Sequence, residues 1–208
     1  MKLRFLPWLL AALAVGLSLS GHFAERNWYF SFEAYSLFPL FGLIAFSLMW
    51  SHYAVDFLQR LFRFEPDNMY LPVTRYLVLF SLLMHPGLLA YAQWQAGFGF
   101  PPASLLLYAG MGLVLFILIG MLSWLIFLSF ELHRWFRDRA WFVWIQVANA
   151  IAMLLIVLHA IELDHPMGWF RYLWYFYGLT MAIFLLKEYY DKARLDLPKS
   201  KLWLNSNR

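Results

Sequence analysis

The chain has 208 residues, of which 63% are hydrophobic, 21% are aromatic and only 13% are charged. An average soluble domain carries roughly 25% charged residues, so this composition excludes an ordinary soluble protein and indicates a membrane protein. The net charge of +4 is too small to suggest a nucleic-acid-binding protein. Cysteine is absent, which excludes disulfides, thiolate-held iron–sulfur clusters and cysteine-ligated haem.

Six apolar runs, each long enough to cross about 30 Å of hydrocarbon, follow one another along the chain. Their length favours helices, because barrel strands need only about ten alternating residues. We therefore predict an all-α, polytopic membrane protein in which a single domain, residues 1–208, forms a six-transmembrane-helix bundle. The predicted helices cover about residues 5–21, 35–57, 70–91, 104–130, 141–163 and 169–186, followed by a short basic cytoplasmic tail at 187–208. No internal repeat stands out.

Lysine and arginine predict the orientation of these helices, because they gather on the cytoplasmic side of membrane proteins. One side has only Arg26 and Arg171. The other side has Lys2, Arg4, Arg60, Arg63, Arg75, Arg134, Arg137, Arg139, Lys187, Lys192, Arg194, Lys199, Lys201 and Arg208. We therefore expect both termini to be cytoplasmic and the protein to lie in a membrane, such as the bacterial inner membrane. The first run also resembles a secretory signal peptide, but a retained helix is favoured because no cleavage site is convincing.

The six histidines differ in their expected depth in the membrane. His22 and His165 fall in predicted outside loops and His133 in an inside loop, where solvated side chains are expected. His52 lies on the second run, about 12 Å from Arg60 at 1.5 Å per residue. It is a candidate metal ligand, quinone contact or helix–helix hydrogen-bonding group, with the last at least as favoured as the others.

His85 and His159 lie in apolar runs that contain no lysine, arginine, aspartate or glutamate. An ionisable side chain deep in a bilayer is costly and usually marks function. Both histidines fall in the outer half of helices that run from inside to outside, and imidazole is the usual ligand of an embedded haem iron. The sequence predicts one haem b with His85 and His159 as axial ligands of the iron. The alternative is two unrelated histidines, each hydrogen-bonded to a neighbouring helix.

Several stretches are similar to the ferric reductase-like transmembrane family, the membrane cytochrome b core of ferric reductases and NADPH oxidases. They are Phe41–Phe46, Thr74–Tyr76 leading to Met84 and His85, and Trp141 followed by His159. The resemblance implies a six-helix bundle with haem b between the third and fifth helices. Family members often stack two haems, but Gln146 stands where the other fifth-helix histidine would fall. A single outer haem is therefore expected.

The chain has no Gly-x-Gly-x-x-Gly motif after a strand and no segment large enough for a flavin or nicotinamide domain. The expected electron donor is a separate flavoprotein reductase or the quinol pool, with a flavin or quinone bridging to the haem from the cytoplasmic side. The expected acceptor is periplasmic or extracellular. Glu162, Asp164 and His165 would attract ferric ion there, although ordinary solvated loop residues are favoured.

The function that follows is that of a haem b-binding membrane subunit, an oxidoreductase component with no catalytic residue of its own to name. It would carry electrons from a cytoplasmic or quinol donor to an acceptor on the outer side, as ferric reductases do. The alternative is a non-enzymatic membrane scaffold or assembly protein with structural histidines. A small transporter is disfavoured, because the sequence shows no paired broken helices.

Overall fold

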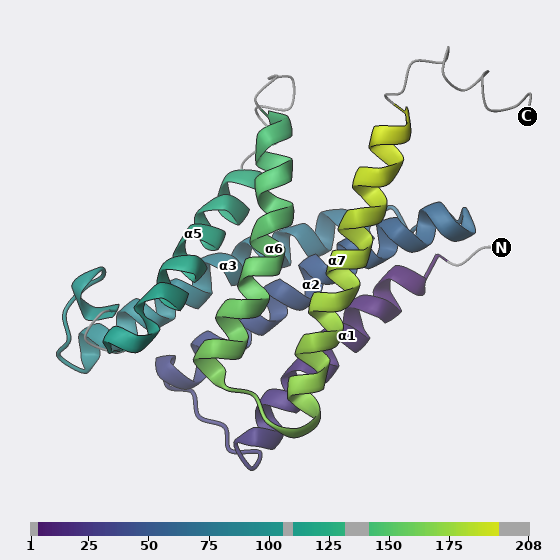
Figure 1. Ribbon diagram of the computed structural model, residues 1–208. Coiled ribbons are helices and arrows are strands. Elements are labelled where there is room, and N and C mark those ends of the chain that lie inside the picture. Colours follow the sequence, from purple (N-terminus) through teal and green to yellow (C-terminus); the bar gives the residue numbers. More distant parts are fainter. Residues whose placement is uncertain (1–3, 106–109, 132–141, 196–208) are drawn as a thin grey trace, which may run out of the picture.

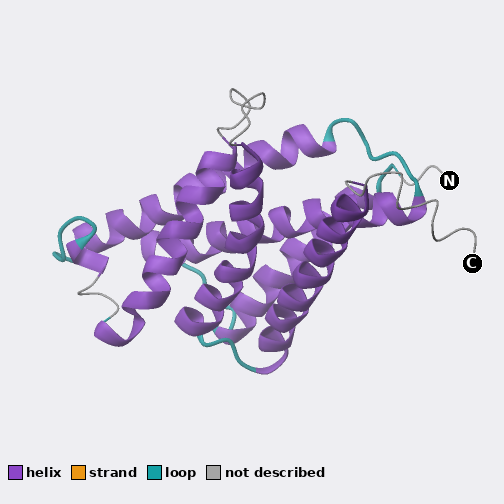
Figure 2. Ribbon diagram, turned by 45° about the horizontal axis from the view of Figure 1, so that its top comes forward, coloured by secondary structure: helices purple, strands orange, loops and turns teal. Residues whose placement is uncertain are grey.

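The computed structural model describes residues 4–105, 110–131 and 142–195. Within these ranges the chain forms α-helices and one short 3₁₀ helix, with no strand (Figure 2). The elements are α1 (Leu6–Glu25), α2 (Ala34–Phe62), α3 (Tyr70–Gln95), η1 (Met111–Leu113), α5 (Val114–Glu131), α6 (Phe142–Asp164) and α7 (Gly168–Leu195). The prediction of an all-α fold is confirmed.

Five of these helices, α1, α2, α3, α5 and α6, are long and apolar enough to cross a membrane. The described part of the chain has the length and composition of an integral membrane protein. A helix is also present at the sixth predicted position, but α7 is not among the five candidate spans. Its first half carries Arg171 and many tyrosines and tryptophans, which are less apolar than leucine or isoleucine.

The fourth predicted helix, residues 104–130, is wrong in its first part. Gly110 has φ 69° and ψ 165°, which is not a helical conformation, and only η1 and then α5 follow it. Glycine adopts positive φ without steric cost, so the chain can turn at this point. The apolar run does not reveal the break, because residues on both sides of Gly110 are equally apolar. Residues 106–109 lie outside the described part of the chain.

The helices pack as two groups that meet in the middle of the molecule (Figure 1). In the first group α2 packs against α1, α3 and α7. In the second group α5 packs against α6, and contacts of α6 with α7 and of α3 with α5 join the two groups. The pairs α2–α3 and α5–α6 have the most extensive helix–helix contacts, so each is a tightly packed hairpin.

Helix α1 has one buried and one exposed face. Besides Pro7 and His22, the buried face has small residues at helical spacing, Ala11, Ala14, Ser18 and Gly21. The exposed face consists of leucines, Leu9, Leu13 and Leu17. Small residues inside and large apolar residues outside are typical of a helix that packs closely on its neighbours and faces lipid.

Buried hydroxyl groups link α1 to α2 and α7. Ser47 Oγ donates to Ser18 Oγ at 2.8 Å, Ser18 Oγ lies 3.1 Å from the Tyr177 hydroxyl, and that hydroxyl donates to the carbonyl of Ala14 at 3.0 Å. Each of these three hydroxyl groups has a hydrogen-bond partner, so none of them is left unsatisfied in the apolar interior.

Gly21 allows the end of α1 to pack against the start of α7. A Cβ at Gly21 would lie 2.2 Å from a ring atom of Phe170, which is itself buried. We expect Gly21→Ala to lower the free energy of unfolding by about 1–3 kcal/mol through overpacking. Gly16→Ala is the matched control, because no atom lies within 4 Å of the added Cβ. Thermal unfolding in detergent measures both, and equal melting temperatures would contradict this packing.

Candidate functional site

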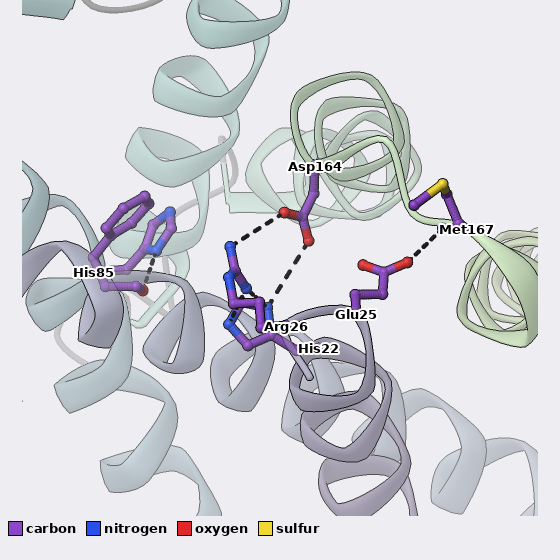
Figure 3. Close-up of polar contacts among 7 residues, drawn as sticks. His22, Glu25, Arg26, His85, Asp164 and Met167 are labelled. Atoms are coloured by element: carbon purple, nitrogen blue, oxygen red, sulfur yellow. Dashed lines mark hydrogen bonds and ion pairs between the residues drawn. The ribbon is translucent and has the colours of Figure 1, made fainter. Parts of the chain in front are cut away.

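His85 lies on α3, and its imidazole is held by the backbone of α2 (Figure 3). Its Nδ1 is 2.7 Å from the carbonyl oxygen of Phe38. A carbonyl oxygen can only accept a hydrogen bond, so Nδ1 carries the proton and donates it. In the neutral ring this leaves the lone pair of Nε2 available to bind a metal ion.

His159 on α6 repeats this arrangement with the backbone of α5. Its Nδ1 is 2.7 Å from the carbonyl oxygen of Phe116, so the same nitrogen is the donor. No hydrogen bond to Nε2 of either ring is found among the described residues. Both histidines therefore have one nitrogen fixed by backbone and the other left free.

Two glycines make room for these rings. Gly42 and Gly120 each lie four residues after the phenylalanine whose carbonyl accepts the hydrogen bond. A Cβ at Gly42 would lie 2.8 Å from Nδ1 of His85, and one at Gly120 would lie 2.2 Å from Cε1 of His159. Real Cβ contacts are essentially never shorter than 3.0 Å, so any side chain at these positions would displace the imidazole.

Each histidine forms a half-site together with the carbonyl that holds it and the glycine beneath its ring. The two half-sites share a sequence motif that the sequence analysis missed. Residues 38–42 and 116–120 both read Phe-x-Leu-x-Gly, and in each case the histidine comes from the helix that packs against the motif. The signal is short, but it was present in the sequence. Hairpins α2–α3 and α5–α6 therefore each contain the same arrangement, a Phe-x-Leu-x-Gly segment on the first helix and a histidine on the second.

The two histidines also lie near each other. The imidazole of His159 is close enough to that of His85 for the two to interact electrostatically. Helices α3 and α6 themselves share almost no close backbone contact among the described residues. The two side chains, rather than the two helix backbones, are therefore what approach each other.

Pro86 and Trp124 join the two hairpins next to this site. Proline has no N–H, so Pro86 leaves the carbonyl of Leu82, four residues earlier, without its usual helical donor. Trp124 on α5 supplies the missing donor, with Nε1 2.7 Å from that carbonyl oxygen. Trp124 lies four residues after Gly120, on the same side of α5. This hydrogen bond therefore connects α3, which carries His85, to α5, whose Phe116 carbonyl accepts the hydrogen bond from His159.

The donor set decides which group this site fits. Among the described residues no cluster of three or more histidine, cysteine, aspartate or glutamate side chains is placed to hold a metal ion. His85 and His159 offer two imidazole nitrogens only. Two axial imidazoles suit an iron that has its other four ligands from a porphyrin, so the residues present fit a haem.

His52 makes a hydrogen bond between helices, which is one of the roles considered for it. Its Nε2 lies 2.7 Å from Oγ1 of Thr74, on α3. His165 lies in the turn between α6 and α7 and is exposed, as predicted for a loop histidine. His133 lies outside the described residues. Gln146 lies on α6, but its side chain is not among those described.

The prediction that His22 is a solvated loop residue is wrong. Helix α1 continues to Glu25, four residues beyond its predicted end, and His22 within it is only 2% exposed. Its ring contacts Arg26 and lies 4.0 Å from a carboxylate oxygen of Asp164 (Figure 3).

Asp164 is exposed, as expected for a solvated residue, but it ends α6 instead of lying in a loop, and its carboxylate lies 3.7 Å from the guanidinium of Arg26. Glu25 accepts a hydrogen bond from the backbone N–H of Met167 nearby. These contacts fasten the end of α1 to the turn between α6 and α7.

The fold and the site define an all-helical protein with membrane-spanning helices and a pair of matched, backbone-anchored imidazoles. No family model matches the chain, and no curated protein or solved structure is significantly similar to it. The function of the pair is therefore inferred from the residues themselves.

Proposed function

We propose that the protein is a haem b-binding membrane subunit that carries electrons from a cytoplasmic or quinol donor to an acceptor on the outer side, as ferric reductases do. The observation that carries the proposal is the matched pair His85 and His159. Each ring has its Nδ1–H held by a backbone carbonyl and its Nε2 free, and the two rings come from different hairpins.

This hydrogen-bonding pattern is the one that metal-binding histidines show in proteins. A ligating imidazole almost always donates its other N–H to a carbonyl or carboxylate, which fixes the tautomer and makes the free nitrogen a better ligand. A histidine that only packs helices needs neither a glycine under its ring nor an equivalent on another hairpin. Because His85 and His159 each have a glycine under the ring and an equivalent on the other hairpin, metal-ligand roles are favoured over purely structural ones.

His85 and His159 would hold the iron, and Phe38 and Phe116 would hold the two imidazoles through their carbonyls. The bound haem supplies one-electron redox chemistry, which the side chains of this chain do not provide. The protein's own contribution is to fix the two nitrogens, to keep the rings neutral, and to surround them with an apolar, water-poor environment.

The distribution of lysine and arginine supports six spans, with α7 as the sixth and both termini cytoplasmic. With this orientation His85 and His159 lie in the outer half of the membrane, near an acceptor outside the cell or in the periplasm. A bacterial inner membrane suits such a protein. Its donor would be a separate flavoprotein reductase or the quinol pool.

The test is a pyridine haemochrome assay on the purified protein. We expect about one haem b per chain, and its loss in both His85→Ala and His159→Ala, because each variant removes one axial ligand. His165→Ala is the matched control, since His165 is exposed in a turn and should leave the haem in place. Colourless wild-type protein, or full haem content in both variants, would contradict the proposal and favour a scaffold with structural histidines.

A further inference from the structure

His52 lies where α2 meets the beginning of α3. Its Nε2 is 2.7 Å from Oγ1 of Thr74, and its ring meets the ring of Tyr70 edge-on at 5.7 Å between centroids. Thr74 is in the second turn of α3 and is buried, whereas His52 is partly exposed. One edge of the imidazole is therefore anchored inside the protein while the ring reaches its surface.

The hydrogen bonds of Thr74 determine which nitrogen of His52 carries the proton. The hydroxyl of Thr74 has a single hydrogen, and it donates this to the carbonyl of Tyr70 at 2.6 Å. Thr74 must then accept from His52, so Nε2 carries the proton and Nδ1 is bare. No hydrogen bond to Nδ1 is found among the described residues.

The surroundings of His52 combine this acceptor with a positive charge. Arg75 follows Thr74 directly and is close enough to His52 to interact with it electrostatically. Arg60 and Arg63, at the other end of the short turn into α3, belong to the same basic side of the chain. By the positive-inside rule this is the cytoplasmic face, so His52 lies near the inner boundary of the membrane.

The unprotonated Nδ1 of His52, next to the positive charge of Arg75, restricts which ligands can bind there. It needs a hydroxyl donor, and the cation stabilises the oxygen anion that remains when the proton leaves. A phospholipid phosphate is already ionised and offers no proton, so its oxygens would repel the lone pair of Nδ1. A quinol dissolved in the membrane has the hydroxyl that this nitrogen needs. Tyr70 is fully buried, so the quinol would meet the exposed part of the His52 ring.

We propose that His52, positioned by Thr74 and assisted by Arg75, forms a quinol-oxidation site on the cytoplasmic side of the α2–α3 hairpin. This inference rests on the haem-binding function proposed above, because the haem is the electron acceptor. One quinol would be oxidised to the quinone by giving up two electrons one at a time to the single haem of the chain, which the outer acceptor would reoxidise between the two steps. The two hydroxyl protons leave through Nδ1 of His52 to the cytoplasmic water.

The separation between the two sites is compatible with such a route. Thr74 and His85 are 11 residues apart on α3, which is about 16 Å along the axis at 1.5 Å per residue. The quinol ring and the macrocycle would each fill part of that length. The site therefore supplies the link between the cytoplasmic side and a single outer haem.

The experiment uses decylubiquinone and the full-length protein in detergent. Binding is measured by isothermal titration calorimetry, and haem reduction by decylubiquinol is followed in a stopped-flow spectrometer. We expect His52→Phe to weaken binding about tenfold, as expected for the loss of one hydrogen bond, and to abolish quinol-driven reduction. Reduction by dithionite and haem content should stay unchanged. His165→Gln is the matched control.

Thr74 provides a second test that does not remove the imidazole. Thr74→Val removes the acceptor that keeps the proton on Nε2, so it should weaken binding several-fold, and Thr74→Ser should restore it. Wild-type protein that does not bind decylubiquinone, or binding displaced by phosphatidylglycerol alone, would overturn the quinol site. Binding is also measured on the haem-free His85→Ala variant. The pyridine haemochrome assay thus shows whether the haem proposal fails. The calorimetric titration with decylubiquinone shows separately whether the quinol site fails.

Discussion

Gly120→Ala is expected to remove most of the haem from the purified protein while leaving the helices folded. The added Cβ would lie 2.2 Å from Cε1 and 2.3 Å from Nδ1 of His159. The ring cannot move away and still keep the 2.7 Å bond to the carbonyl of Phe116. Its Nε2 would then be displaced from the position in which it can bind the iron. Haem per chain and the visible spectrum measure this loss.

The other glycines give a graded series of controls for this prediction. At Gly42 the added Cβ would lie 2.8 Å from Nδ1 of His85, so Gly42→Ala should cause a smaller loss. At Gly87, two residues after His85, no atom lies within 4 Å. Gly87→Ala should keep full haem and raise helix stability by up to about 1 kcal/mol. Equal haem content in all three variants would show that the glycines do not make room for ligands.

The helices were largely predictable, because length and apolar composition are properties of the sequence itself. All six predicted positions carry a helix, and most boundaries differ by a few residues. The errors arise where tertiary packing or local backbone conformation decides. His22 is buried because α1 extends to meet the α6–α7 turn, and the fourth run is interrupted at Gly110 by backbone conformation alone.

The two histidines of the candidate site could be singled out from the sequence, but the groups that hold them could not. Two histidines without nearby charge stand out in any apolar sequence. Their hydrogen-bond acceptors are backbone carbonyls, which every residue has, so no residue type marks Phe38 or Phe116 as the partner. The glycines were the available signal, since both follow Phe-x-Leu-x. Recognising that signal required knowing which helices pack together.

The contact between Trp124 and Leu82 leads to a prediction about how the two half-sites are kept in register. Trp124→Phe keeps the ring but removes the only donor found among the described residues for the Leu82 carbonyl beyond its own helix. An unpaired carbonyl in an apolar interior costs about 1–3 kcal/mol, so the variant should unfold more readily. Because α5 also carries the Gly120 half-site, haem should be lost at a lower temperature. Trp169→Phe, at an exposed tryptophan, is the matched control.

Pro86 makes this prediction specific to one hydrogen bond. Alanine at position 86 has an N–H that can donate to the Leu82 carbonyl within α3, so the carbonyl no longer depends on Trp124. Trp124→Phe should therefore cost much less in a Pro86→Ala background than in the wild type, with a coupling of about 0.5–3 kcal/mol. Unfolding of the four proteins of this cycle in detergent measures that coupling. If Trp124→Phe cost the same in both backgrounds, the tryptophan would stabilise the protein by packing, and the proline would have no part in aligning the hairpins.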